Sequence, residues 1–202
     1  SNACNFKCSY CGPPYSSTWM QEIKKHGAYP TSDRFNSMEG MEAEDKVPIL
    51  HKDYNPYVEA FWKWWPELYR DLHTFRITGG EPMLAKDTWK VLDYIIEQKE
   101  PNRNLNFAIN SNLGLRTEMI EKLITKINKI EDEGRVNEFI IFTSLDSWGK
   151  QAEYQRFGLD FNLFWDNLNL ILEKCPRVNV TIMSTYNALS VPNYDKLIRG
   201  VY

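Results

Sequence analysis

Three of the four cysteines in this chain lie close together near its start. Cys4, Cys8 and Cys11 have the spacing C-x3-C-x2-C, while Cys175 lies far along the chain. Three thiolates so close in sequence suit a soft metal centre. An iron–sulfur cluster normally takes four cysteines, so three of them on a four-iron cluster would leave one iron free to bind a ligand.

A structural zinc site is the other chemistry that this trio allows. Such a site needs four ligands, usually supplied as two pairs. The fourth would have to be His26, His51 or Cys175, and none of these stands at a familiar spacing. The sequence contains no charged segment followed by an apolar one, the pattern of an export signal. Disulfides are rare in proteins that are not exported, so the clustered cysteines are expected to be metal ligands rather than disulfide partners.

A second motif, "ITGGEP", follows about 70 residues after the cysteines. Gly79 and Gly80 have no side chains, so backbone can approach a ligand closely there. Glu81 could then accept a charge-assisted hydrogen bond from a cationic group. The plainer alternative is a Gly-Gly turn followed by a solvated glutamate.

Together, "CNFKCSYC" and "TGGEP" resemble the radical S-adenosylmethionine (radical SAM) superfamily. The resemblance implies that Cys4, Cys8 and Cys11 hold a [4Fe–4S] cluster. It implies that S-adenosylmethionine (AdoMet) chelates the fourth iron, and that a reduced cluster cleaves it to a 5′-deoxyadenosyl radical. By the same resemblance Tyr10 touches the adenine, and Gly79, Gly80 and Glu81 contact the methionine part of AdoMet.

Four further polar positions take roles from this resemblance. Asn110 or Asn112 would reach the cofactor, or would simply close a turn. Ser144 stands where the family often binds the ribose. Asp146 would bind ribose or substrate, or cap the following turn. Arg156 would pair with the AdoMet carboxylate through its planar fork, the alternative being a surface ion pair.

Strands and helices alternate regularly from residue 74 onward, which predicts βαβ units and a parallel sheet. The predicted helices are 87–98, 117–133, 162–174 and one that begins at 192, and the predicted strands are 74–78, 105–110, 138–145 and 178–186. Counting the cysteine loop as the end of a first strand gives about five β/α units. We therefore expect an α/β fold, a partial (β/α)6 TIM-like barrel, with its chemistry at the carboxyl ends of the strands.

We interpret residues 1–202 as one radical SAM core domain, a fragment that lacks the last, C-terminal barrel unit. Residues 13–73 do not follow the alternation of strands and helices. They are expected to form an elaborated first crossover with an aromatic-rich insert, "FWKWW". Within it Asn55-Pro56 is expected to open one helix and Pro66 another, because proline suits a first helical turn.

Charge and hydropathy exclude some classes of partner. The net charge is −3 and opposite charges are mixed along the chain, so we expect no general nucleic-acid binding. No apolar run approaches the roughly 20 residues that span a bilayer, so we expect no membrane insertion and a cytoplasmic protein. The expected protein partner is a flavodoxin- or ferredoxin-like electron donor, which the resemblance implies.

The sequence thus predicts a radical SAM enzyme, an oxidoreductase or transferase, of unidentified substrate. The residue pattern in the second half of the chain favours a peptide or protein substrate. A small molecule stays open, because 7-carboxy-7-deazaguanine synthase shares the same motifs. Two other classes also remain: a zinc-binding interaction module, and a degenerate barrel that binds partners without turnover.

Overall fold

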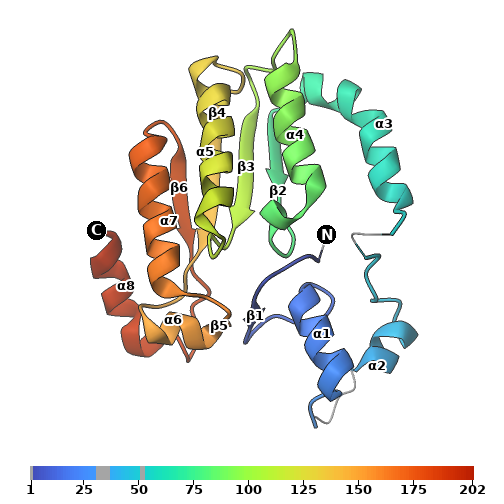
Figure 1. Ribbon diagram of the computed structural model, residues 1–202, viewed down its shortest axis with the longest axis vertical. Coiled ribbons are helices and arrows are strands. Elements are labelled where there is room, and N and C mark those ends of the chain that lie inside the picture. Colours follow the sequence, from blue (N-terminus) through green and yellow to red (C-terminus); the bar gives the residue numbers. More distant parts are fainter. Residues whose placement is uncertain (1, 31–36, 51–52) are drawn as a thin grey trace.

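Four parallel strands form the sheet at the centre of the molecule (Figure 1). The computed structural model describes residues 2–30, 37–50 and 53–202. The sheet order is β2-β3-β4-β6, so the four strands lie side by side in the order in which they occur along the chain. The bounds are Thr74–Ile77 for β2, Asn106–Ser111 for β3, Glu138–Ser144 for β4 and Asn179–Met183 for β6.

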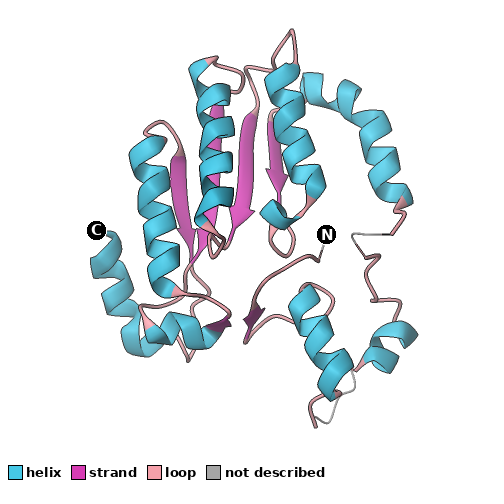
Figure 2. Cartoon of the chain, in the orientation of Figure 1, coloured by secondary structure: helices cyan, strands magenta, loops and turns pink. Residues whose placement is uncertain are grey.

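Three amphipathic helices cover one face of this sheet (Figure 2). They are α4 (Lys86–Glu97), α5 (Thr117–Asp132) and α7 (Phe161–Lys174). Side chains alternate across a strand, so every second residue faces these helices. Phe107, Ile109, Phe139 and Ile141 do so and are completely buried. Alternate residues face the opposite side of the sheet, and in the outer strands Thr74–Ile77 and Asn179–Met183 these are the exposed ones.

This architecture confirms the predicted fold class, a partial TIM-like barrel with parallel strands. The count of about five units differs, because the sheet holds four strands among the described residues. The cysteine loop does not end a strand of this sheet. Its short strand β1 (Lys7–Cys8) pairs antiparallel with β5 (Arg156–Phe157), a two-residue strand that follows α6 (Lys150–Gln155).

The segment 13–73 contains three helices in the part that the structure describes; residues 31–36 and 51–52 of the segment lie outside it. They are α1 (Ser17–His26), α2 (Met38–Ala43) and α3 (Pro56–Asp71). Asn55 caps α3 as predicted, but Pro66 lies inside that helix and opens none. Pro66 has no backbone N–H and so cannot donate a helical hydrogen bond. Trp65 and Tyr69, on either side of it, are buried, and their packing stabilises the helix at this position.

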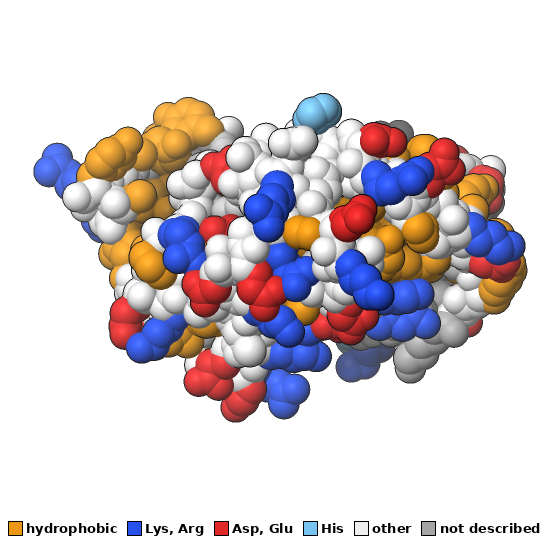
Figure 3. Space-filling view, turned by 90° about the horizontal axis from the view of Figure 1, so that it is seen from above, with side chains coloured by type: hydrophobic (Ala, Val, Ile, Leu, Met, Phe, Trp, Pro, Cys, Tyr) orange, Lys and Arg blue, Asp and Glu red, His pale blue; other side chains and the backbone are white. Residues whose placement is uncertain are grey.

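The remaining elements are short or terminal: η1 (Pro82–Leu84), η2 (Val191–Asn193) and α8 (Tyr194–Val201). None of the helices in the described residues combines the length and the apolar character that crossing a membrane requires. On the face seen in Figure 3, acidic and basic side chains lie interspersed. The strands all point their carboxyl ends towards the cysteine loop (Figure 1), and the candidate site lies at that edge.

Candidate functional site

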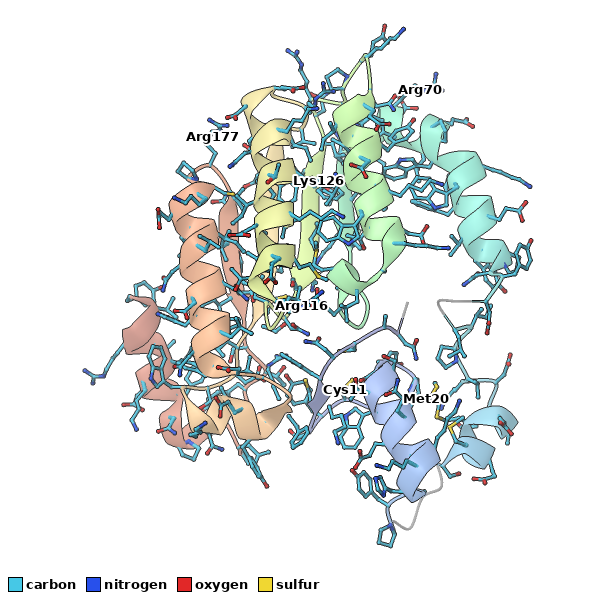
Figure 4. All side chains as sticks on the ribbon, viewed as in Figure 1. Cys11, Met20, Arg70, Arg116, Lys126 and Arg177 are labelled. Carbon is cyan, nitrogen blue, oxygen red and sulfur yellow. The ribbon has the colours of Figure 1, made fainter. Side chains whose placement is uncertain are left out.

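The cysteine loop is fastened to the start of α1, beside the carboxyl ends of the strands (Figure 4). The Ser17 hydroxyl accepts from the Cys4 N–H at 3.0 Å, and the Thr18 hydroxyl donates to the Cys4 carbonyl at 2.5 Å. The Trp19 indole donates to the Cys8 carbonyl at 3.0 Å. These anchors were not predicted from the sequence, although Ser17, Thr18 and Trp19 follow the cysteine motif within eight residues.

The three thiols of the loop are free and lie close enough to interact electrostatically. Burial raises the pKa of Cys8 to about 11, with nearby Arg156 opposing it, and burial also raises the pKa of Cys4 and of Cys11. Among the described residues no three His, Cys, Asp or Glu side chains are already grouped to hold a metal ion. Of the possible fourth zinc ligands, His51 lies outside those residues.

Gly79 and Gly80 bring the end of β2 against the cysteine loop. The Glu81 N–H donates to the Ala3 carbonyl oxygen at 2.6 Å. A Cβ atom on Gly80 would lie 2.3 Å from that oxygen and 2.9 Å from Cys4 Cβ, which no side chain can tolerate. Gly79 has φ +141°, in the region that favours glycine. The two glycines therefore let the cysteine loop dock directly on the strand end.

The Glu81 carboxylate is buried between the ends of β2 and β3, with 1% of the residue exposed. It accepts hydrogen bonds from the Asn112 N–H at 2.7 Å, the Ser111 hydroxyl at 3.0 Å and the Met83 N–H at 3.1 Å. Burial raises its pKa to about 7, and the three hydrogen bonds oppose this shift. Glu81 is therefore not the solvated glutamate of a plain turn.

The raised pKa of Glu81 predicts a pH-dependent stability. Between the ordinary value of 4.5 and about 7, the folded chain keeps a proton that the unfolded chain has lost. The free energy of unfolding should therefore fall as pH rises through this window, by about 3 kcal/mol from this group. Urea denaturation from pH 4.5 to 8 measures it. Glu81→Gln should flatten the profile, and Glu118→Gln, an exposed control in α5, should keep it; equal slopes for both variants would contradict the prediction.

The asparagines and Ser144 lie at the same edge of the sheet. The Asn112 side chain accepts from the Gly114 N–H at 3.0 Å, which closes the turn after β3. Asn110 faces the open side of the sheet, where its side-chain oxygen Oδ1 accepts a hydrogen bond from Arg76 Nε at 2.6 Å. Ser144 ends β4 and is half-buried. Contacts of these three residues with a cofactor remain predictions.

Asp146 joins several parts of the site through one buried carboxylate. Arg156 donates to it through Nε at 2.7 Å and through Nη2 at 3.1 Å. The Tyr10 hydroxyl donates to it at 2.6 Å, and the Thr185 N–H at 2.7 Å. Arg156 also points Nη1 at the Cys8 sulfur, 3.9 Å away. The Arg156 guanidinium thus makes its two hydrogen bonds to Asp146, and its pairing with an AdoMet carboxylate stays a prediction.

A cavity of about 620 Å³ runs along Thr78, Gly79 and Gly80 and is bordered by Asn2. Asn2 is 4% exposed, yet both polar atoms of its side chain lack a hydrogen-bond partner. Buried polar groups are nearly always satisfied, so such an amide next to an open cavity suits a ligand. The Asn2 amide and the three thiols belong to the same N-terminal segment, and the cavity lies between that segment and the end of β2.

A family model described as the radical SAM superfamily matches residues 1–187. The chain belongs to the radical SAM superfamily. Membership implies a [4Fe–4S] cluster and AdoMet as its cofactors. A comparison with curated proteins finds no match.

Solved structures of low sequence identity share the radical SAM fold. Native anSMEcpe with bound AdoMet is similar with a TM-score of 0.56 and 16% identity, over 98% of this chain and 45% of that one. Native anSMEcpe with bound AdoMet and Kp18Cys peptide gives a TM-score of 0.53 and 18% identity, over 98% and 45%. The chain therefore spans less than half the length of the structures it matches.

The residues of this radical SAM chain fit the cofactors that the family implies. Three thiols on one loop are the donor set that iron–sulfur clusters take. The absence of a side chain at Gly80 lets this loop dock against the end of β2. The side-chain amide of Asn2, which borders the cavity, has no hydrogen-bond partner. Cys4, Cys8 and Cys11 would hold the cluster, with Arg156 beside the Cys8 sulfur.

Proposed function

We propose that this chain is the core of a radical SAM enzyme acting on a substrate not yet identified. Cys4, Cys8 and Cys11 would hold a [4Fe–4S] cluster, which in its reduced state would supply the electron for reductive cleavage of AdoMet and so for hydrogen abstraction from the substrate. The observation that carries the proposal is the docking of the three-cysteine loop on Gly80 and Glu81, at the carboxyl ends of parallel strands. Active sites of barrel folds lie at this edge.

The chain's own residues would divide the work as follows. Cys4, Cys8 and Cys11 would bind the cluster through their sulfurs. Gly79 and Gly80 expose backbone to the cavity where the methionine part of AdoMet would lie. Tyr10 has 43% of its surface exposed and would offer its ring to the adenine.

The proposed polar contacts of AdoMet and substrate lie around the carboxyl-terminal edge of the sheet. They are Asp146, Arg156, Asn110, Asn112 and Ser144. In the chain as it stands, Asp146 fixes the Tyr10 hydroxyl and the Arg156 guanidinium. The Glu81 carboxylate accepts a hydrogen bond from the Asn112 N–H and thereby fixes the conformation of the turn after β3.

For the substrate we propose a peptide or protein. One structure with the same fold, anSMEcpe, was solved with AdoMet and the Kp18Cys peptide, which supports this class by fold alone. A small molecule is the second candidate, because the cofactor motifs do not distinguish the two. The proposed partner is a flavodoxin- or ferredoxin-like electron donor, in the cytoplasm, where thiols such as these three stay reduced.

Anaerobic reconstitution with iron and sulfide tests the proposed function. We expect a four-iron electron paramagnetic resonance signal after reduction, a change of that signal when AdoMet is added, and release of 5′-deoxyadenosine. Cys8→Ala should abolish all three, because it removes a cluster ligand. The matched control is Cys175→Ala, whose sulfur is buried beyond the end of α7 and should leave them unchanged.

The rival classes predict different results in the same experiment. A zinc-binding module takes up stoichiometric zinc and gives no iron signal. A degenerate barrel gives the cluster signal without any 5′-deoxyadenosine. Either result would overturn the proposal.

A further inference from the structure

Arg76 lies on the face of the sheet that α4, α5 and α7 leave open. In β2 the neighbouring Phe75 and Ile77 turn towards the apolar core, so Arg76 turns the other way and is exposed. Its register partner on β3 is Ala108, whose small side chain leaves room for a long one to lie across the sheet.

Three neighbouring strands hold the Arg76 guanidinium in place. Its Nε donates to the side-chain oxygen Oδ1 of Asn110, on β3, at 2.6 Å. Its Nη2 lies 3.1 Å from the Met183 sulfur, from β6. Its Cζ lies 3.9 Å above the centre of the Phe142 ring, from β4. A long flexible side chain is thereby fixed before any ligand arrives, which lowers the entropic cost of binding.

All three contacts are neutral, so the positive charge of Arg76 is not balanced by them. Within the described part of the chain no Asp or Glu oxygen lies within 4.0 Å of Arg76. Arg135, Arg156 and Arg177 each have such a carboxylate partner. A guanidinium has five N–H donors, and the contacts above use two of them. The others remain for a ligand on the open face.

The position of Arg76 relates it to the proposed active site. Its partner Asn110 is followed in β3 by Ser111, whose hydroxyl donates to the Glu81 carboxylate at 3.0 Å. The guanidinium therefore lies next to the strand end on which the cysteine loop docks, on the inner side of the partial barrel. A molecule bound at this edge would face Arg76.

We propose that Arg76 is an oxyanion-binding residue that holds a carboxylate or phosphate group of the substrate. The planar fork of arginine matches both groups with two parallel hydrogen bonds. Phe142 and the exposed Met183 side chain form an apolar surface beside it. The substrate class is thus a molecule with an anionic group next to an apolar part. That this ligand is the substrate rests on the proposed function; the oxyanion site itself does not.

Calorimetric titration of the reconstituted, oxidised chain saturated with AdoMet tests this site. The probes are pyrophosphate and the dicarboxylate glutarate, at constant ionic strength because surface charge effects are screened by salt. We expect saturable binding of at least one probe, and the stronger one tells phosphate from carboxylate. Arg76→Gln should weaken it about tenfold or more.

Two further variants make the test specific. Arg76→Lys keeps the charge and loses the fork, so it should also weaken binding, by several-fold. Arg103→Gln removes an exposed arginine in the turn before β3 and should bind as the unaltered chain does. Equal binding by Arg76→Gln and the unaltered chain, or no saturable binding of either probe, overturns the proposal.

The outcome is separable from that of the proposed function. Probe binding is measured without reduction, while AdoMet cleavage is measured on the unaltered, reduced protein. A chain that binds pyrophosphate through Arg76 and yields no 5′-deoxyadenosine would keep this site and refute the proposed activity. A chain that cleaves AdoMet and binds neither probe would do the reverse.

Discussion

Gly80→Ala is expected to lower cluster binding about tenfold while the four-stranded sheet stays folded. The added Cβ would lie 2.3 Å from the Ala3 oxygen and 2.9 Å from both Ala3 carbon and Cys4 Cβ. Two of these atoms are backbone, so no side-chain rotation relieves the overlap, and the cysteine loop must move away from the strand. The hydrogen bond from Glu81 N–H to Ala3 would then be lost, at a cost of about 1 kcal/mol.

The consequence for the cluster is larger than the consequence for stability. Cys4 follows Ala3 directly, so displacing Ala3 displaces the first proposed ligand relative to the other two. We expect the iron bound after reconstitution to fall about tenfold, since a cluster needs all its ligands in place. Far-UV circular dichroism should change little, because Phe107 and Phe139 remain buried under the helices.

Gly12→Ala is the matched control, in the same loop. Its Cβ would meet only Pro14 Cδ, at 3.7 Å, which is an ordinary contact. Iron uptake by this variant should equal that of the unaltered chain. If Gly80→Ala also binds its full complement of iron, docking on Gly80 does not position the thiols.

The alternation of strands and helices was predictable from the sequence because each element carries its own pattern. The predicted strand 105–110 is observed as Asn106–Ser111, and the predicted helix 117–133 as Thr117–Asp132. In such elements the buried face repeats every second residue in a strand and every three to four in a helix, and no distant contact is needed to recognise it.

The cysteine loop escaped the same reasoning because its structure depends on distant residues. Cys8 pairs in register with Arg156, and Lys7 with Phe157, in an antiparallel ladder of two residues. Nothing near Cys8 in the sequence indicates that partner. The motif did identify the chemistry of the loop, while its place beside the sheet, rather than within it, is set by tertiary contacts.

Roles of polar side chains were the least predictable part of the site. Arg156 was expected to bind a cofactor carboxylate, which stays a prediction, while its two hydrogen bonds to Asp146 were not expected from the sequence. Arg76 attracted no attention, because an arginine in a short strand carries no motif. Its meaning depends on which face it occupies and on neutral neighbours from three other strands, such as Phe142.

Asp146→Ala is expected to be the most destabilising single change in the site. Asp146 is completely buried, and Arg156 has 7% of its surface exposed. Removing the carboxylate leaves a buried guanidinium without its partner and the Thr185 N–H without its acceptor. Breaking a buried pair in this way costs about 3 to 5 kcal/mol. Urea denaturation followed by circular dichroism measures the free energy of unfolding.

A second substitution distinguishes two contributions of Arg156 to stability, the cost of its unpaired charge and the gain from the packing of its side chain. In Asp146→Ala the unpaired cation carries most of the cost, so adding Arg156→Met should restore part of the stability by removing it. The exposed ion pair of Lys150 and Glu153 is the control, and Lys150→Ala should change stability far less. If the double variant is less stable than Asp146→Ala, the arginine contributes more through packing than through charge. The Asp146–Arg156 pair would then not be the electrostatic centre of this edge of the sheet.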